Sequence, residues 1–304
     1  MSNKRLWRIL LIVISGLLVL IFLAVCLGRG GRSSVQERHY FSEQDAAREI
    51  YFENDRIFTS RDSYVRVSGN KVTITRSGTY MLKGDLEDGQ VIVDVGKEAE
   101  VKLKLNDFKA TCSFGSPIYV KSAKKLRLRL KDGSENELIQ VDAAAAGREE
   151  ANSKTTAAGK EKADSSTTAA GDESLIDEAK GCIYARSDLT IKGGGSLRVE
   201  TSHRHGIFSS KDLRIKGGDI TVDAPRQALH GKKSVLIDDG ILTLKAGTDG
   251  IHSNGILEIN GGKLEIDAGK YGMYAFTRLY VDKAAQVDVV RALSRAGCQG
   301  EMEY

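Results

Sequence analysis

The feature that most constrains the fold is a repeat of about 22 residues in the second half of the chain. Each copy has a short alternating strand, a glycine turn and a second alternating strand. The equivalent isoleucines are 24, 22 and 22 residues apart, at Ile191, Ile215, Ile237 and Ile259, with a weaker copy at Val281. One such unit cannot bury its own apolar side chains, whereas stacked copies can. The constant step therefore predicts an all-β parallel β-helix whose coils have three short strands.

The third strand of each coil pairs an aliphatic residue with an aromatic residue or a histidine. The aliphatic residues are Ile118, Ile183, Ile207, Leu229, Ile251 and Met273. Because neighbouring side chains on a strand point to opposite faces, an inward aliphatic column implies an outward second column. The same strand of the next coil lies about 4.8 Å away. We therefore expect an outward-facing ladder of stacked rings, made by Tyr119, Tyr184, Phe208, His230, His252 and Tyr274.

Glycine and proline usage agrees with such coils. The chain has 32 glycines and only 2 prolines. Glycines recur at two positions of the repeat, after the first strand and before the third, where we expect the coil to turn its corners. Strands that all have hydrogen-bonded neighbours tolerate few prolines. Earlier segments at 72–74, 90–93, 101–105 and 126–130 fit the scheme less regularly. A two-sheet sandwich is the alternative, but it does not predict a constant step.

The N-terminus predicts a membrane anchor. Residues 1–8 are basic, and an uncharged apolar run of 19 residues follows at 9–27, enough to cross a bilayer as a helix. The flanking positive charges place the N-terminus in the cytoplasm and the rest of the chain outside the membrane. A cleaved signal or a lipid anchor near Cys26 is the alternative. Residues 28–46 are expected to form a stalk.

The remaining segments set the boundaries of the predicted β-helix at 47–290. Residues 142–178 lack aromatic residues and repeat the letters TTAAG, which is typical of an inserted loop. The stretch 291–304 loses the repeat and is expected to be a tail or a cap. The chain carries a net charge of +4, but residues 1–38 contribute +5, which leaves −1 on the rest. This near-neutral remainder argues against a nucleic-acid partner. We expect no disulfide among Cys112, Cys182 and Cys298.

Several segments together resemble one bacterial family, the carbohydrate-binding domain-containing β-helix proteins, whose fold is similar to that of pectate lyases. The segments with the strongest likeness are 77–80, 84–94, 101–106, 131–138, 187–193 and 206–213. The resemblance covers roughly 47–290. It implies a right-handed parallel β-helix that binds pectin-like or cellulose-like polysaccharides at the cell surface, in adhesion or substrate capture, with calcium in the fold.

Two alternatives follow for the ladder. Exposed aromatic faces can dock against the C–H faces of sugar rings, which makes the ladder a candidate carbohydrate-binding surface. The same rings could instead only stabilise the coils by stacking on one another. The resemblance also leaves two further hypotheses open, a polysaccharide lyase-like enzyme acting on acidic glycans and a surface scaffold without a glycan ligand.

The resemblance weakens at the residues that would hold calcium. The family often has Asp-Gly-Ile where the third strand begins. The equivalent column here reads His205, Gln227, Asp249 and Tyr271, so only Asp249 keeps the acid. Calcium takes six to eight oxygen ligands, normally with several carboxylates. Asp249 is therefore the one candidate metal ligand in this column, and the histidines nearby are candidate bases for the lyase hypothesis.

Overall fold

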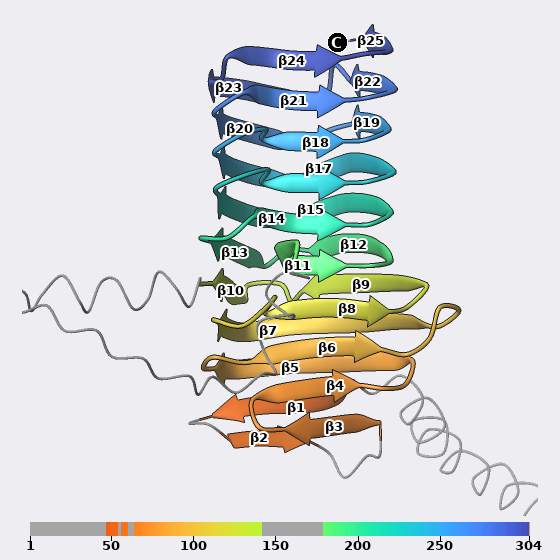
Figure 1. Ribbon diagram of the computed structural model, residues 1–304, viewed down its shortest axis with the longest axis vertical. Coiled ribbons are helices and arrows are strands. Elements are labelled where there is room, and N and C mark those ends of the chain that lie inside the picture. The colour runs from red at the N-terminus through yellow and green to blue at the C-terminus, as the bar shows by residue number, and fades with distance from the viewer. Residues whose placement is uncertain (1–46, 54–55, 60–63, 142–178, 304) are drawn as a thin grey trace, which may run out of the picture. The chain divides into compact units, whose positions relative to one another are not determined.

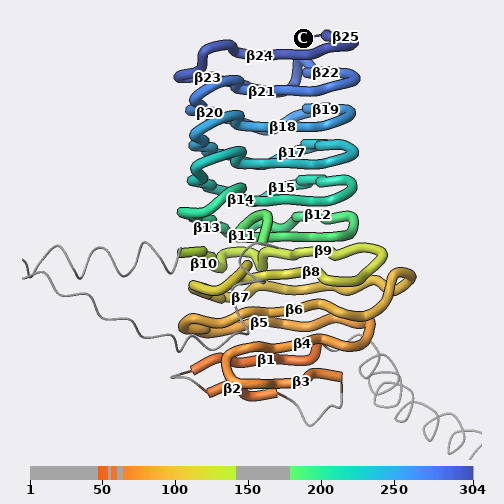
Figure 2. The backbone as a smooth tube through the Cα atoms, in the orientation of Figure 1, coloured from red at the N-terminus to blue at the C-terminus, as the bar shows by residue number. Residues whose placement is uncertain are grey.

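The computed structural model describes residues 47–53, 56–59, 64–141 and 179–303. These residues form parallel coils made only of strands and turns (Figures 1 and 2). The expected anchor at 9–27, stalk at 28–46 and inserted loop at 142–178 lie outside the described residues. Within the described ranges, no helix is long and apolar enough to cross a membrane.

The strands form two sheets along the coils. The ten-stranded sheet contains the predicted third strands, and its members are β3 (Val65–Ser68), β4 (Lys71–Ile74), β6 (Gln90–Asp94), β8 (Ile118–Ser122), β11 (Gly181–Ala185), β14 (His205–Ser209), β16 (Leu229–Gly231), β18 (Ile251–Ser253), β21 (Tyr271–Ala275) and β24 (Ser294–Cys298). The fifteen-stranded sheet contains β1 (Arg48–Glu53), β2 (Arg56–Thr59), β5 (Gly78–Leu86), β7 (Glu100–Cys112), β9 (Lys125–Leu130), β10 (Glu135–Gln140), β12 (Asp188–Gly193), β13 (Ser196–Thr201), β15 (Asp212–Ala224), β17 (Ser234–Ala246), β19 (Ile256–Ile259), β20 (Lys263–Ala268), β22 (Arg278–Val281), β23 (Gln286–Arg291) and β25 (Glu301–Glu303).

Equivalent residues of successive coils pair directly, as the repeat predicts. Ile191 pairs with Ile215, which pairs with Ile237, which pairs with Ile259, all in parallel register. The aliphatic column of the third strand also points inward, since its members from Ile118 to Met273 are at most 2 % exposed. Aliphatic residues from both sheets thus fill one continuous core. The parallel β-helix prediction is confirmed.

Three coils differ from the prediction in how many strands they contain, whereas the separate strands β9 and β10, β12 and β13, β19 and β20, and β22 and β23 agree with it. We expected the glycine turn to separate the first strand from the second. In β7, β15 and β17, however, a single strand of 13 residues runs through this corner and bends there. In the pairing of β15 with β17, the register shifts before Lys216 and again between Lys216 and Asp219, at the bend of β15. The first and second strands of the repeat therefore belong to one sheet, because pairing between coils resumes after the corner.

The two ends of the coil stack differ from the regular coils between them. At the N-terminal end, β1 pairs with β2 and β3 with β4 in antiparallel fashion, before parallel pairing begins. At the other end, β24 pairs with β21 and β25 with β22 in the parallel sense. The segment after 290, expected to be a tail or a cap, adds β24 to the ten-stranded sheet and β25 to the fifteen-stranded sheet (Figure 1). The repeat was not recognised there because apolar residues are sparse beyond Val290.

The corner glycines serve two different purposes. After the first strand they adopt positive φ, for example +124° at Gly193 and +127° at Gly240. Before the third strand they allow close packing, because a Cβ on Gly250 would lie 2.3 Å from Ile266. Glycine is therefore needed after the first strand for its backbone conformation, and before the third strand because there is no space for a side chain.

Candidate functional site

The predicted ladder exists and is continuous along the ten-stranded sheet. Its six members pair in register from coil to coil, from Tyr119 to Tyr274. Ring centroids are 5.2, 5.5, 4.8, 4.8 and 4.8 Å apart along the column. Such distances are typical of stacked and edge-to-face aromatic pairs. The ladder therefore adds ring contacts on the outer face of the coils.

The first half of the ladder is not exposed, which corrects the expectation of an open aromatic surface. Tyr119, Tyr184 and Phe208 are 8 %, 3 % and 2 % exposed and form their own apolar cluster with Ile92. The Arg186 guanidinium lies over the rings of Tyr119 and Tyr184, and its Nε donates to the Tyr184 hydroxyl at 3.2 Å.

His205 completes the cover of this half. Its ring stacks on that of Phe208 at 5.4 Å with an interplanar angle of 27°. Side chains from one strand start, at His205, and from just beyond one strand end, at Arg186, thus fold over the column, which period-two alternation alone does not reveal. These three rings stabilise the fold and are closed to a large ligand.

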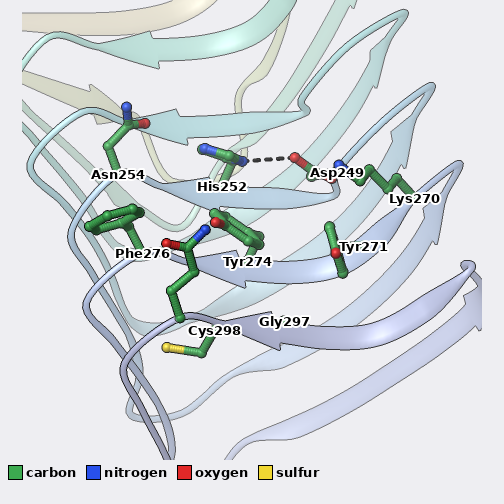
Figure 3. A pocket seen from close by; sticks show the side chains of 10 residues that line it. Asp249, His252, Asn254, Lys270, Tyr271, Tyr274, Phe276, Gly297 and Cys298 are labelled. Carbon is green, nitrogen blue, oxygen red and sulfur yellow. Dashed lines mark hydrogen bonds and ion pairs between the residues drawn. The ribbon is translucent and has the colours of Figure 1, made fainter.

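The ladder ends in an open pocket at its C-terminal side. The residue that pairs with Tyr274 in the next coil is Gly297, so the column ends there, and the Tyr271 ring lies beside Gly297 with its centroid 5.3 Å from that of Tyr274. Beside it lies a pocket of about 670 Å³ (Figure 3). Its walls include His252 and Tyr274 from the ladder, Tyr271, the exposed Phe276 and Lys270. We call this the aromatic pocket.

An acid and a histidine are joined in the wall of the aromatic pocket. His252 Nδ1 lies 2.7 Å from Asp249 Oδ2, and Gln227 Nε2 donates to the same oxygen at 3.3 Å. Burial raises the pKa of the Asp249 carboxyl, but hydrogen bonds from His252 and Gln227 outweigh it and leave that pKa below its usual value. An ionised Asp249 accepts the Nδ1 proton of His252 and so fixes the tautomer of the ring.

The column of Asp249 does not match a calcium site. It supplies one carboxylate, and one oxygen of that carboxylate is engaged by His252 and Gln227. Asp249 Oδ1 and Gln227 Oε1 are buried without a hydrogen-bond partner among the described residues, which gives two free side-chain oxygens where calcium takes six to eight ligands. The described part of the chain also contains no group of three or more His, Cys, Asp or Glu side chains arranged for a metal. Asp249 instead orients His252.

Two further histidines lie between the covered and the open halves of the ladder, and of these His205 is buried and His230 is half-buried. The His205 and His230 ring centroids are 5.0 Å apart, and His230 Nε2 lies 2.8 Å from Asn254 Oδ1. Burial, reinforced by the neighbouring His230 and by Arg226 and Arg204, lowers the pKa of His205 to about 3. Burial, reinforced by His252, lowers the pKa of His230 to about 4. Both rings are therefore neutral in the folded protein near neutral pH.

We expect these histidines to make stability fall as the pH is lowered from about 6.5 towards 4. Their folded pKa values lie below the ordinary value of 6.5, so the unfolded chain takes up protons first. Their contribution is complete above pH 6.5 and is lost on acidification, whereas the depressed pKa of Asp249 acts only below about 4. The slope of unfolding free energy against pH is proportional to the number of protons taken up on unfolding. His230→Phe should lower that number by about one in this window. Urea denaturation between pH 4 and 7 measures it, and equal slopes in the two proteins would refute the assignment.

The pocket combines residues that the sequence identified with residues that it did not. His252, Tyr274 and Asp249 were predicted from the repeat and meet in one wall (Figure 3). Tyr271, Phe276 and Lys270 were missed because they lie at or just beyond the ends of the third strand. The sequence does not indicate Gly297, because the apolar spacing of the repeat is weak beyond Val290. A glycine at a ladder position is the signal that could have located the opening.

The comparisons with known proteins agree with this architecture. Residues 68–297 match the family model described as carbohydrate-binding domain-containing protein. The chain belongs to that family. This match confirms, over the greater part of the chain, the family resemblance that the sequence indicated.

Two relatives extend the comparison. A carbohydrate-binding domain-containing protein of Acetivibrio thermocellus is 35 % identical over 197 residues, which cover 65 % of this chain and 60 % of that relative's length. A gadolinium derivative of the polysaccharide lyase-like protein from C. thermocellum superimposes with a TM-score of 0.73 at 32 % identity. That alignment covers 84 % of this chain and 96 % of the solved one. The family and the β-helix fold therefore have independent support.

Proposed function

We propose that this protein binds polysaccharide without cleaving it, and that the aromatic pocket is its primary site. The observation that carries the proposal is the end of the ladder at Gly297, where Tyr274 and Tyr271 line a pocket of about 670 Å³. Sugar rings have apolar C–H faces that pack on aromatic rings at small ordering cost. Family membership and the relative described as carbohydrate-binding support the same ligand class.

Each wall of the pocket has a part in this binding. Tyr274 and Tyr271, whose ring centroids are 5.3 Å apart, provide the stacking surface, and Phe276, which is 53 % exposed, extends it. His252 is held by Asp249 through Nδ1, so its Nε2 is left to meet a sugar hydroxyl. The Lys270 ammonium attracts the carboxylate of an acidic sugar. The proposed ligand is a pectin-like or cellulose-like chain.

We further propose that the protein acts at the outer surface of a membrane, in adhesion or substrate capture. The support is the apolar run at 9–27 with its basic flank at 1–8, which together predict a single span with the β-helix outside. No calcium enters the proposal, because the column of Asp249 supplies too few oxygens.

The test is retention of the full-length protein, in detergent, on a panel of immobilised polysaccharides with and without a chelator. We expect retention on at least one acidic or neutral plant-type polymer and no change when calcium is removed. Retention on none of the polymers would favour the scaffold hypothesis and overturn the proposal. Loss of retention with the chelator would show that calcium acts at residues other than those of the aromatic pocket.

One observation favours a second candidate function, elimination in an acidic glycan. The Asp249–His252 pair resembles an oriented general base, since a carboxylate fixes the ring and leaves Nε2 at an open pocket beside Lys270. The solved relative is also called polysaccharide lyase-like. Incubation with polygalacturonate decides between the two, because elimination creates an unsaturated uronide that absorbs in the ultraviolet. We expect no such absorbance, and its appearance in wild-type protein but not in His252→Ala would establish the enzyme.

A further inference from the structure

A second hollow lies on the fifteen-stranded sheet, at the corner where the first strand of the repeat bends into the second. Glycines from successive coils line it, and we call it the glycine groove: Gly193, Gly194, Gly217, Gly218, Gly240 and Gly262. It has a volume of about 620 Å³. Positive φ values, including +137° at Gly217 and +89° at Gly262, favour glycine at these positions, and glycine carries no side chain. The floor is therefore bare backbone over several coils.

Backbone pairing is irregular along this floor. Between β15 and β17 the register shifts on both sides of Lys216. Lys216 pairs with Asp239, and the next pair is Asp219 with Ile241. Gly217 and Gly218 lie between these two pairs and have no paired residue in β17. Peptide groups at such interruptions are open to partners other than the neighbouring strand. A ligand rich in hydroxyl groups, which donate and accept hydrogen bonds, suits this floor.

The walls of the glycine groove are apolar and basic. Ile241 is 53 % exposed although it lies in a long β-strand. Lys216 has a carboxylate nearby, Asp238 Oδ2 at 3.7 Å. Lys263 has no ion-pair partner among the described residues, and the one carboxylate lining the groove, Asp239, accepts the Gly240 N–H at 2.8 Å. An anionic ligand with an apolar face complements these walls.

We propose that the glycine groove is a second saccharide site, which takes an extended acidic polysaccharide lying across the coils. Sugar hydroxyls meet the backbone floor, a ring face packs on Ile241, and uronate carboxylates pair with Lys263 and Lys216. The proposal rests on the proposed polysaccharide binding but uses the other sheet, since the aromatic pocket lies along β18, β21 and β24. Two sites on one rigid stack increase the avidity for long polymers without any new contact.

The test uses the full-length protein and a double variant, Ile241→Ser with Lys263→Gln. Both side chains are exposed, so the fold should persist. The matched control is Ile256→Ser with Lys233→Gln, the same substitutions at exposed positions outside both sites, with Ile256 in the same sheet and Lys233 in the bend before β17. Calorimetric titration with a short oligogalacturonate gives the number of sites, and titration with polygalacturonate gives the avidity.

We expect the stoichiometry for the oligosaccharide to fall from two sites to one in the double variant, with avidity for the polymer lowered at least about ten-fold. The control should keep both values. An unchanged stoichiometry and avidity in the folded double variant would overturn the proposal that the glycine groove binds saccharide, and would leave the aromatic pocket proposal standing. If the wild-type protein binds no polysaccharide, the proposed function fails together with it, so the two failures are distinguishable.

Discussion

Replacing Tyr274 by alanine is expected to lower polysaccharide affinity by about ten-fold or more. The substitution removes the last ring of the ladder from the wall of the aromatic pocket, and an aromatic packing contact with its buried area contributes about 1.5–3 kcal/mol. Each 1.4 kcal/mol corresponds to about a factor of ten in affinity. Affinity electrophoresis or calorimetry on the polymer that retains the wild-type protein measures the loss.

Two controls separate the stacking role from general damage. Tyr274→Phe keeps the ring and should retain most of the affinity. Tyr280→Ala removes another half-buried tyrosine, on β22 outside both pockets, and should bind as the wild type does. Because Tyr274 also stacks on His252 at 4.8 Å, thermal denaturation must show that the alanine variant is folded. Wild-type affinity in a folded Tyr274→Ala protein would mean that the aromatic pocket is not the site.

Replacing Gly193 by alanine should destabilise the coils severely. A Cβ at this position would lie 1.9 Å from the Leu130 carbonyl oxygen of the preceding coil, and the residue has a φ of +124°. The clash is with backbone, so no side chain can move to relieve it. We expect a loss of more than about 4 kcal/mol in unfolding free energy, at the upper end for point substitutions. The melting temperature should fall by roughly 10 °C or more.

Gly96→Ala is the matched control for backbone strain. Gly96 has a φ of +91°, but a Cβ there would meet nothing within 4 Å. Its substitution should cost only the strain of positive φ, about 1–3 kcal/mol. The difference between the two variants isolates the close approach of neighbouring coils. Equal losses would contradict the packing of Gly193 against Leu130.

The regular coils were predictable because their signal is repeated. Stacking requires equivalent residues in every coil, so the inward column at Ile191, Ile215, Ile237 and Ile259 appears as a constant step in the sequence. The same argument placed Tyr274 and His252 on the outer face and in one column. Even the joining of two predicted strands through the glycine corner changes only the number of sheets, and leaves the coil itself as predicted.

The candidate site was predictable only in part, because its opening depends on exceptions to the repeat. Alternation indicates which face a ring occupies, but not whether Arg186 or His205 folds over it. The opening of the aromatic pocket at Gly297 lies in the last coils, where the spacing of apolar residues is weakest.

The sequence by itself determined the coil, since a period that recurs along the chain reports an interaction between neighbours in space. Tertiary structure alone decided which part of the ladder is open to a ligand and that Asp249 orients His252. The physical reason is that burial and hydrogen bonding depend on side chains from different strands and loops meeting at one place. No periodicity along the chain records such a meeting, so it appears only once the coils are stacked.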